Sequence, residues 1–158
     1  MTSTIDSKKK QDNYREQFRR LNSARRSGFN LEAIFISYAI LSDRCEAILR
    51  YEGNSLKPRR NGKTPNLKEL LNRIRKLSEE EGTLLSKYIK SDLVDRADAW
   101  KEERNKLTHA LLNQELTSEE LKESADEGYR IARKMADAGR NYKQAIERKT
   151  GVKIEEAE

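Results

Sequence analysis

The chain has 158 residues, of which 35% are hydrophobic and 38% charged, and 33 Lys and Arg outnumber 27 Asp and Glu to give a formal charge of +6. This composition fits one domain with a narrow core, and the positive balance would attract a polyanion such as RNA, DNA or an anionic membrane. No apolar run reaches about 18 residues and the N-terminus lacks an apolar stretch, which excludes a membrane-spanning helix and a signal peptide. We therefore expect a soluble, cytoplasmic protein.

The first third of the chain predicts a tail followed by two helices. Residues 1–11 are polar and include three consecutive lysines at 8–10, so we expect a flexible basic tail. A first helix should run from about residue 12 to residue 26, and a second should be capped by Asn30 and stop at Gly53. The second helix has the strongest core pattern, with apolar residues at helical spacing at Leu31, Ile34, Phe35, Tyr38, Leu41, Cys45, Ile48 and Leu49.

The segment from Gly53 to Pro65 should form a loop, because it contains proline and glycine among polar residues. Its cations are Lys57, Arg59, Arg60 and Lys63. A loop of this composition cannot bury itself, so its charges face water or a ligand. We interpret these four residues, with the lysines of the tail, as candidates for contacts to RNA phosphates that do not depend on base sequence, although they could serve solubility alone.

Further helical signals follow this loop. Asn66 with Glu69 resembles a capping arrangement and opens a short amphipathic helix. A helical turn or two is expected over residues 84–89. Either Ser91 or Asp92 can then start a long helix.

The last part of the chain has a clear start and stop for one long helix. Thr117 with Glu120 forms a second capping box, and Gly151 provides the stop. Residues 152–158 form an acidic tail. The expected fold is therefore all-α, an up-and-down bundle of four to six helices formed by residues 12–151 as a single domain.

One arginine interrupts the apolar seam of the helix that starts near residue 91. At about 100° per residue, one narrow sector of that helix carries Leu93, Ala97, Trp100, Arg104, Leu107 and Leu111. Burying an unpaired guanidinium is costly, so Arg104 must meet a carboxylate, a partner chain or a bound anion. Asn105 and the only histidine of the chain, His109, lie four residues apart on a face turned away from this seam.

A structural interpretation of the same residues stays open. Arg104 would then pair with a core carboxylate such as Glu46 or Glu32, and His109 would be an exposed helix residue. Cys45 lies on an apolar face and is interpreted as a buried small hydrophobe. One cysteine and one histidine cannot form a disulfide or a zinc site, so a metal would need carboxylates and water, and we expect no cofactor.

The sequence RNKLTH, with Arg104, Asn105 and His109, resembles the R-x4-6-H motif of the HEPN superfamily. The long helices expected before and after it are similar to the order of elements in HEPN domains, and this coarse similarity covers about residues 30–144. Many HEPN proteins are metal-independent endoribonucleases, commonly toxins of toxin–antitoxin pairs or phage-defence effectors. Others have lost activity and only bind RNA or protein partners.

The resemblance implies a role for each motif residue. His109 would transfer protons, Arg104 would hold the scissile phosphate, and Asn105 would orient the site. Cleavage of unpaired RNA by its own 2′-hydroxyl gains from both an acid and a base, yet each chain has one histidine, so a homodimer with a composite site is implied. Some HEPN toxins carry a tyrosine two residues after the histidine, which an antitoxin protein modifies. Leu111 stands there in this chain, which argues against that regulation.

Two other functions fit the same sequence. A non-catalytic helical module would bind RNA or a protein partner through its positive charge, without requiring His109. A subunit of a hetero-complex would dock another protein through a stripe from Tyr129 to Tyr142 on the last helix, without requiring Arg104. Only the nuclease hypothesis needs both motif residues.

Overall fold

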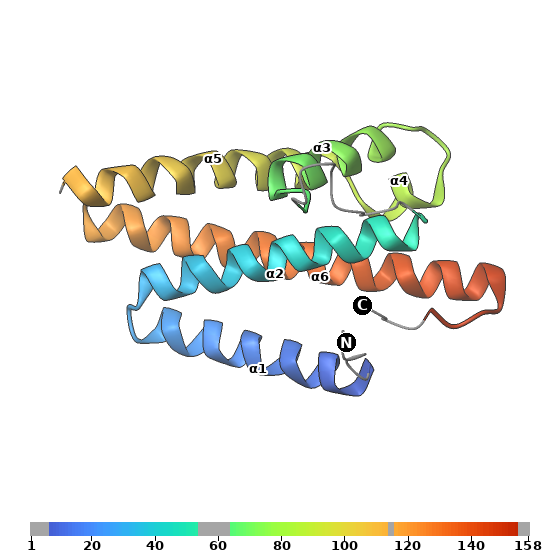
Figure 1. Ribbon diagram of the computed structural model, residues 1–158, viewed down its shortest axis with the longest axis horizontal. Helices are drawn as coiled ribbons and strands as arrows, with labels where there is room; N and C mark the ends of the chain where they lie inside the picture. Colours follow the sequence, from blue (N-terminus) through green and yellow to red (C-terminus); the bar gives the residue numbers. More distant parts are fainter. Residues whose placement is uncertain (1–6, 54–63, 114–115, 155–158) are drawn as a thin grey trace.

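The structure of the protein is a computed structural model that describes residues 7–53, 64–113 and 116–154. Within these ranges the chain forms six helices and no strand, which confirms the predicted all-α bundle. The long helices run up and down, and α2 lies across α6, with α1 on one side and with α3 and α5 on the other (Figure 1). No helix in the described ranges is long and apolar enough to cross a membrane. The helices are α1 (Ser7–Arg26), α2 (Asn30–Tyr51), α3 (Leu67–Ser78), α4 (Leu84–Tyr88), α5 (Ser91–Asn113) and α6 (Ser118–Thr150).

The start of the bundle differs from the sequence-based prediction in two places. Helix α1 begins at Ser7, so residues 8–11 are helical rather than part of a tail. The N-cap of α2 is Phe29, without a side-chain cap bond, so the prediction that Asn30 caps this helix is wrong. The turn is closed by the backbone instead, since Gly28 takes a positive φ of 75° and the Phe29 amide donates to the Ala24 carbonyl at 2.9 Å.

The other helix boundaries follow the predicted signals. The Asn66 side chain accepts a hydrogen bond from the Glu69 amide at 3.0 Å. Thr117 and Glu120 form the reciprocal capping box at the start of α6. Gly151 ends α6 in the left-handed region, with a φ of 70°. These local signals fix where the helices start and stop, but not how they pack.

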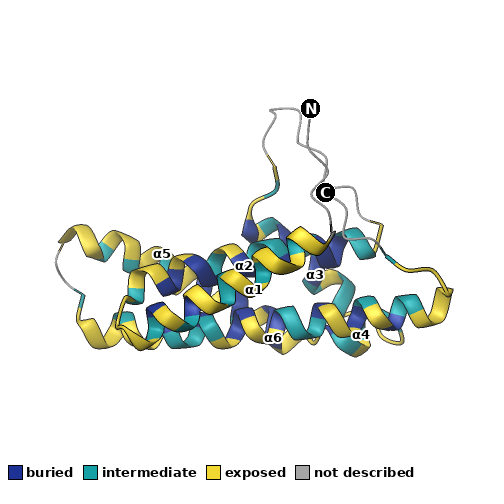
Figure 2. Ribbon diagram, turned by 90° about the horizontal axis from the view of Figure 1, so that it is seen from below, coloured by how far each residue is buried: buried dark blue, intermediate teal, exposed yellow. Residues whose placement is uncertain are grey.

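The core is centred on α2 and the inward face of α6. Figure 2 shows buried residues between the helices and exposed ones on their outer faces. Tyr142 of α6 is 2% exposed, and Tyr129 is half-buried beneath the Arg25 guanidinium, whose carbon lies 3.8 Å from the ring centroid. The prediction of an exposed docking stripe from Tyr129 to Tyr142 is therefore wrong. Other residues of that stretch that are buried in the core are Ile131, Ala132 and Met135.

Arg25 also fastens the C-terminal end of α1 to α6 through an ion pair with Asp126, at 3.1 Å. Burial alone would raise the pKa of the Asp126 carboxyl, but hydrogen bonds from Lys122 and Arg25 outweigh it and hold that pKa below its usual range. The carboxylate therefore stays charged and paired at neutral pH. This contact holds the C-terminal end of α1 against α6.

Trp100 of α5 determines how closely α5 approaches α6. Its indole nitrogen donates to the Ser124 carbonyl at 2.9 Å, and its ring lies against Gly128. A Cβ at Gly128 would lie 2.4 Å from Cζ2 of Trp100, which is far inside van der Waals contact. Both helices would have to move apart to admit any side chain there.

We predict that Gly128→Ala lowers the free energy of unfolding by about 1–3 kcal/mol, because overpacking costs more than the helix propensity that alanine gains. Urea denaturation followed by circular dichroism measures this. Gly139→Ala is the matched control on the same helix, since its Cβ would lie 3.4 Å from Cγ1 of Ile48, an ordinary contact. The control should be neutral or stabilising, and equal losses in the two variants would contradict the packing described here.

Candidate functional site

The predicted motif lies on the part of α5 that extends beyond the core. The buried residues of α5 end at Lys101, and from Glu102 to Asn113 none is buried. Leu107 is half-buried and Leu111 is 38% exposed, so the predicted apolar seam is buried only in its first half. The first turns of α6, which face this end of α5, are mostly charged and offer little apolar surface in return.

Arg104 lies where the seam leaves the core, and it stacks on an aromatic ring of α2. Its guanidinium carbon is 4.0 Å from the centroid of the Tyr38 ring, and Nη1 reaches Oδ1 of Asn105 at 3.5 Å. Such a stack contributes about 0.5–1 kcal/mol at a partly exposed site. A guanidinium that contacts a ring through its face keeps the N–H groups along its edge for an anion, and two of them can bind two oxygens of a tetrahedral phosphate.

The alternative in which Arg104 pairs with a core carboxylate is not what the structure shows. Glu46 pairs with Arg50 at 3.4 Å, and Glu32 pairs with Arg20 at 3.3 Å. Arg104 forms no ion pair with any residue of the described ranges. It is therefore a half-buried cation whose charge is not balanced by a carboxylate of the described residues.

Asn105 and His109 are exposed on the same helix, as predicted, but His109 does not meet Arg104. Residues 104 and 109 are five apart, which places their side chains about 140° apart around the helix and about 7.5 Å apart along it. Two side chains donate hydrogen bonds to backbone carbonyls along this turn. The Thr108 hydroxyl donates to the Arg104 carbonyl at 2.9 Å, and the Asn113 amide donates to the His109 carbonyl at 3.5 Å. One chain thus brings Arg104 and Asn105 together and leaves His109 apart.

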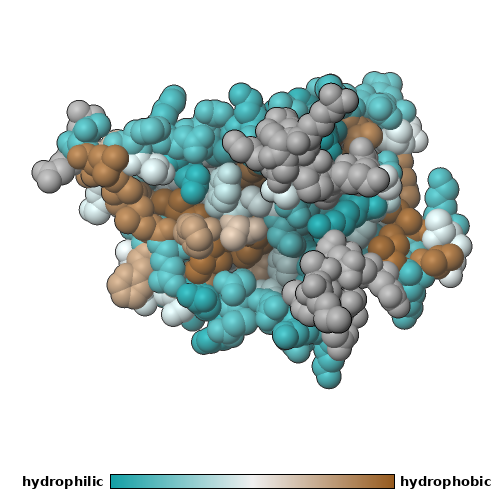
Figure 3. Space-filling view, in the orientation of Figure 1, coloured by the Kyte–Doolittle hydropathy of each residue, from teal (hydrophilic) through white to brown (hydrophobic). Residues whose placement is uncertain are grey.

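Exposed apolar side chains lie at the start of α2 and at the end of α5, on the same helix as the motif. They are Leu31 and Phe35 of α2, which are 49% and 69% exposed, and Leu111 and Leu112 of α5, which are 38% and 85% exposed; we call these four residues the apolar end. Figure 3 shows hydrophobic side chains gathered at the end of the molecule where α5 finishes and α2 begins. Helical periodicity predicts Leu31 and Phe35 in the core, and this prediction is wrong because periodicity does not show which side of α2 has no neighbour.

Four predicted contacts to RNA phosphates lie outside the described residues: Lys57, Arg59, Arg60 and Lys63.

Comparison of the chain with models of protein families, with curated proteins and with solved structures found no match. The interpretation of the site therefore depends on the geometry of Arg104, its neighbours and the apolar end.

We predict that Arg104→Met changes the free energy of unfolding by no more than about 1 kcal/mol, because it removes one stacking contact and leaves no carboxylate unpaired. Thermal and urea unfolding measure the difference. Arg75→Met is the contrasting control, because Arg75 pairs with Asp95 at 3.0 Å and with the half-buried Asp98 at 3.2 Å, and losing it should cost more. A loss of about 3–5 kcal/mol for Arg104→Met would instead indicate a buried pair.

Proposed function

We propose that this chain is an HEPN-type, metal-independent endoribonuclease that acts as a homodimer. The observation that carries the proposal is Arg104, a cation stacked on Tyr38 with no carboxylate partner in the described residues, on the helix that holds the only histidine. A protein gains little stability from such an arginine. Its geometry is suited to an anion that comes from outside the chain.

The chemistry that fits these residues is transesterification of RNA. The 2′-hydroxyl oxygen bonds to the adjacent phosphorus while the bond from phosphorus to the 5′-oxygen breaks, leaving a 2′,3′-cyclic phosphate and a 5′-hydroxyl. A base takes the proton of the 2′-hydroxyl and an acid supplies one to the departing oxygen. Arg104 stabilises the negative charge that develops on the phosphorane oxygens, and Asn105 hydrogen-bonds the sugar or phosphate.

A second copy of the chain supports this chemistry in two ways. Each chain has one histidine, so two copies of His109 would provide both the acid and the base. Arg104 and His109 point about 140° apart within one helix, so a phosphate between two α5 helices can touch the arginine of one copy and the histidine of the other. A twofold axis through the motif would achieve this, because it brings identical surfaces together.

The apolar end gives the dimer a physical basis. Exposed apolar side chains that gather on one surface usually mark an interaction site, and Phe35 and Leu112 are among the most exposed large hydrophobic residues of the described ranges. Pairing of two apolar ends would bury them and would exclude water from the motif between them. A nuclease of this kind would damage its host's RNA, so we further propose a toxin or phage-defence role, with an antitoxin protein as a possible partner of the same site.

We predict that the purified protein cleaves unstructured RNA in the presence of EDTA and leaves products with 2′,3′-cyclic phosphate ends. His109→Ala should reduce the cleavage rate by about 10²–10⁴-fold, because it removes proton transfer while the exposed position leaves folding unchanged. Gel-based kinetics with end-group analysis provide the measurement. Single-stranded DNA of the same sequence should stay intact, since it has no 2′-hydroxyl.

The matched control is Glu103→Ala, which alters an exposed polar residue of the same helix to which no catalytic role is assigned. This variant should cleave at the wild-type rate. If the wild type binds RNA and leaves it intact, the catalytic proposal fails and the non-catalytic RNA-binding module replaces it. Cleavage that persists in His109→Ala would equally contradict the assigned role of His109.

A further inference from the structure

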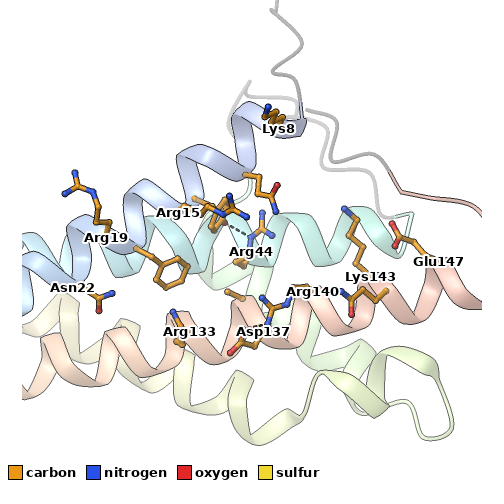
Figure 4. Close-up of a pocket in the computed structure, with 15 residues that line it drawn as sticks. Lys8, Arg15, Arg19, Asn22, Arg44, Arg133, Asp137, Arg140, Lys143 and Glu147 are labelled. Atoms are coloured by element: carbon orange, nitrogen blue, oxygen red, sulfur yellow. Dashed lines mark hydrogen bonds and ion pairs between the residues drawn. The ribbon is translucent and has the colours of Figure 1, made fainter.

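A second charged feature lies away from the motif, in a groove between α1 and α6. The groove has a volume of about 1090 Å³, and seven of its fifteen lining residues are Lys or Arg while only Asp137 and Glu147 are acidic. Figure 4 shows Arg15 and Arg19 on α1, with the Arg19 side chain pointing away from α6, and Arg133, Arg140 and Lys143 on α6. At the C-terminal end of α1, Arg25 holds the two helices together through its ion pair with Asp126 and its contact with the Tyr129 ring.

The positive charge of the chain is concentrated on α1, which forms one side of this groove. Helix α1 contains eight Lys and Arg and only two acids, Asp12 and Glu16, so its net charge of +6 equals that of the whole chain. The other residues of the chain therefore carry no net charge when they are taken together. A field localised on one side of a molecule attracts and orients an anion far better than the same charge spread evenly.

The floor of the groove is a fixed cation on α2. Arg44 is 8% exposed, its guanidinium carbon lies 4.0 Å from the Tyr14 ring centroid, and Nη2 pairs with Asp43 at 2.8 Å. Burial alone would raise the pKa of the Asp43 carboxyl, but the hydrogen bonds donated by Tyr14 and Arg44 outweigh it and lower that pKa. The floor is therefore rigid and nearly neutral, and the walls carry the excess charge.

The arginines that line the groove on α1 and α6 differ in whether they already form ion pairs. Arg19 pairs with Glu16 at 2.6 Å and Arg140 with Asp137 at 2.8 Å. Arg15 forms no ion pair with any residue in the described ranges, and Arg133 only covers the Phe18 ring, with its guanidinium carbon 5.5 Å from the centroid. Arg15 and Arg133 are thus the two groove cations best able to bind a new anion.

The shape and lining of the groove favour a strand of nucleic acid over a protein or a membrane. Protein interfaces are centred on apolar anchors, but here Tyr14 and Phe18 are already covered by Arg44 and Arg133. A basic helix binds a bilayer by inserting its apolar face, and that face of α1 is packed into the bundle through Leu21 and Ala24. A concave surface lined by arginines suits a sugar-phosphate backbone.

We propose that the groove between α1 and α6 binds the backbone of a single-stranded nucleic acid without reading its sequence. From Lys8 to Asn22 the groove follows α1 for about 21 Å, which spans about six nucleotides at a rise of about 3.4 Å each. Its Asn22 end is directed toward the end of the molecule that carries the motif (Figure 1). The inference rests on the proposed function only in taking RNA as the natural strand, which the groove would feed toward Arg104 and His109.

The test measures binding of a fluorescein-labelled oligothymidylate and of the same length of 2′-O-methyl RNA, neither of which can be cleaved through a 2′-hydroxyl. Fluorescence anisotropy titrations are run at several salt concentrations with the full chain. The double variant Arg15→Gln/Arg133→Gln should weaken binding at least tenfold in low salt. It should also reduce the slope of log K against log salt by about 1.4, since each phosphate contact on a single strand contributes about 0.7.

The charge-matched control is Lys68→Gln/Lys76→Gln, which removes two exposed cations from α3, outside the groove. It should change affinity less than threefold. Equal losses in the two double variants would show general electrostatics and overturn the proposal. The proposal would also be overturned if Arg15→Gln/Arg133→Gln bound the oligonucleotides with wild-type affinity. The same holds if this variant lost binding only to phosphatidylserine vesicles or to polyglutamate.

The outcomes separate this inference from the proposed nuclease. Loss of strand binding in the groove variant, with no RNA cleavage by the wild type, supports the groove and rejects the nuclease. Cleavage that depends on His109, together with unchanged strand binding by the groove variant, supports the nuclease and rejects the groove.

Discussion

The structure depends on how little apolar surface this chain has to bury. Helix α2 packs against α1, α3 and α6, and eleven of its residues are buried, compared with nine in α6. Helix α5 has five buried residues, all in its first half. It is placed so that its last twelve residues, from Glu102 to Asn113, extend beyond the core. The motif lies on this extended end.

This placement of α5 explains the unusual position of Arg104. The apolar pattern of α5 continues through Leu107 to Leu111, but the core stops near Trp100 and Lys101. Arg104 is the first residue of the pattern beyond the core, and it covers Tyr38 rather than pairing with a carboxylate of the described residues. A cation that is partly desolvated and oriented by a ring, beside exposed leucines, fits an interface more readily than a free surface.

Local features were predicted well from the sequence and tertiary relations were not. The capping residues Asn66 and Thr117 determine helix starts within one turn, so they could be identified without a structure. The contact between Tyr38 and Arg104 joins residues distant in the chain, and the groove depends on α1 diverging from α6. Periodicity shows which residues share a face, but not whether another helix covers that face, and for this reason Leu31 and Phe35 were wrongly placed in the core.

The central claim is that two chains meet at the apolar end and form one site. Sedimentation equilibrium of the wild type, Phe35→Asp and Val152→Asp tests it most directly, because both residues are largely exposed but only Phe35 belongs to the apolar end. The account predicts a wild-type mass twice the 18.4 kDa of one chain, the same for Val152→Asp, and a folded, inactive monomer for Phe35→Asp. A monomeric wild type that cleaves RNA, or a Phe35→Asp dimer, would contradict it.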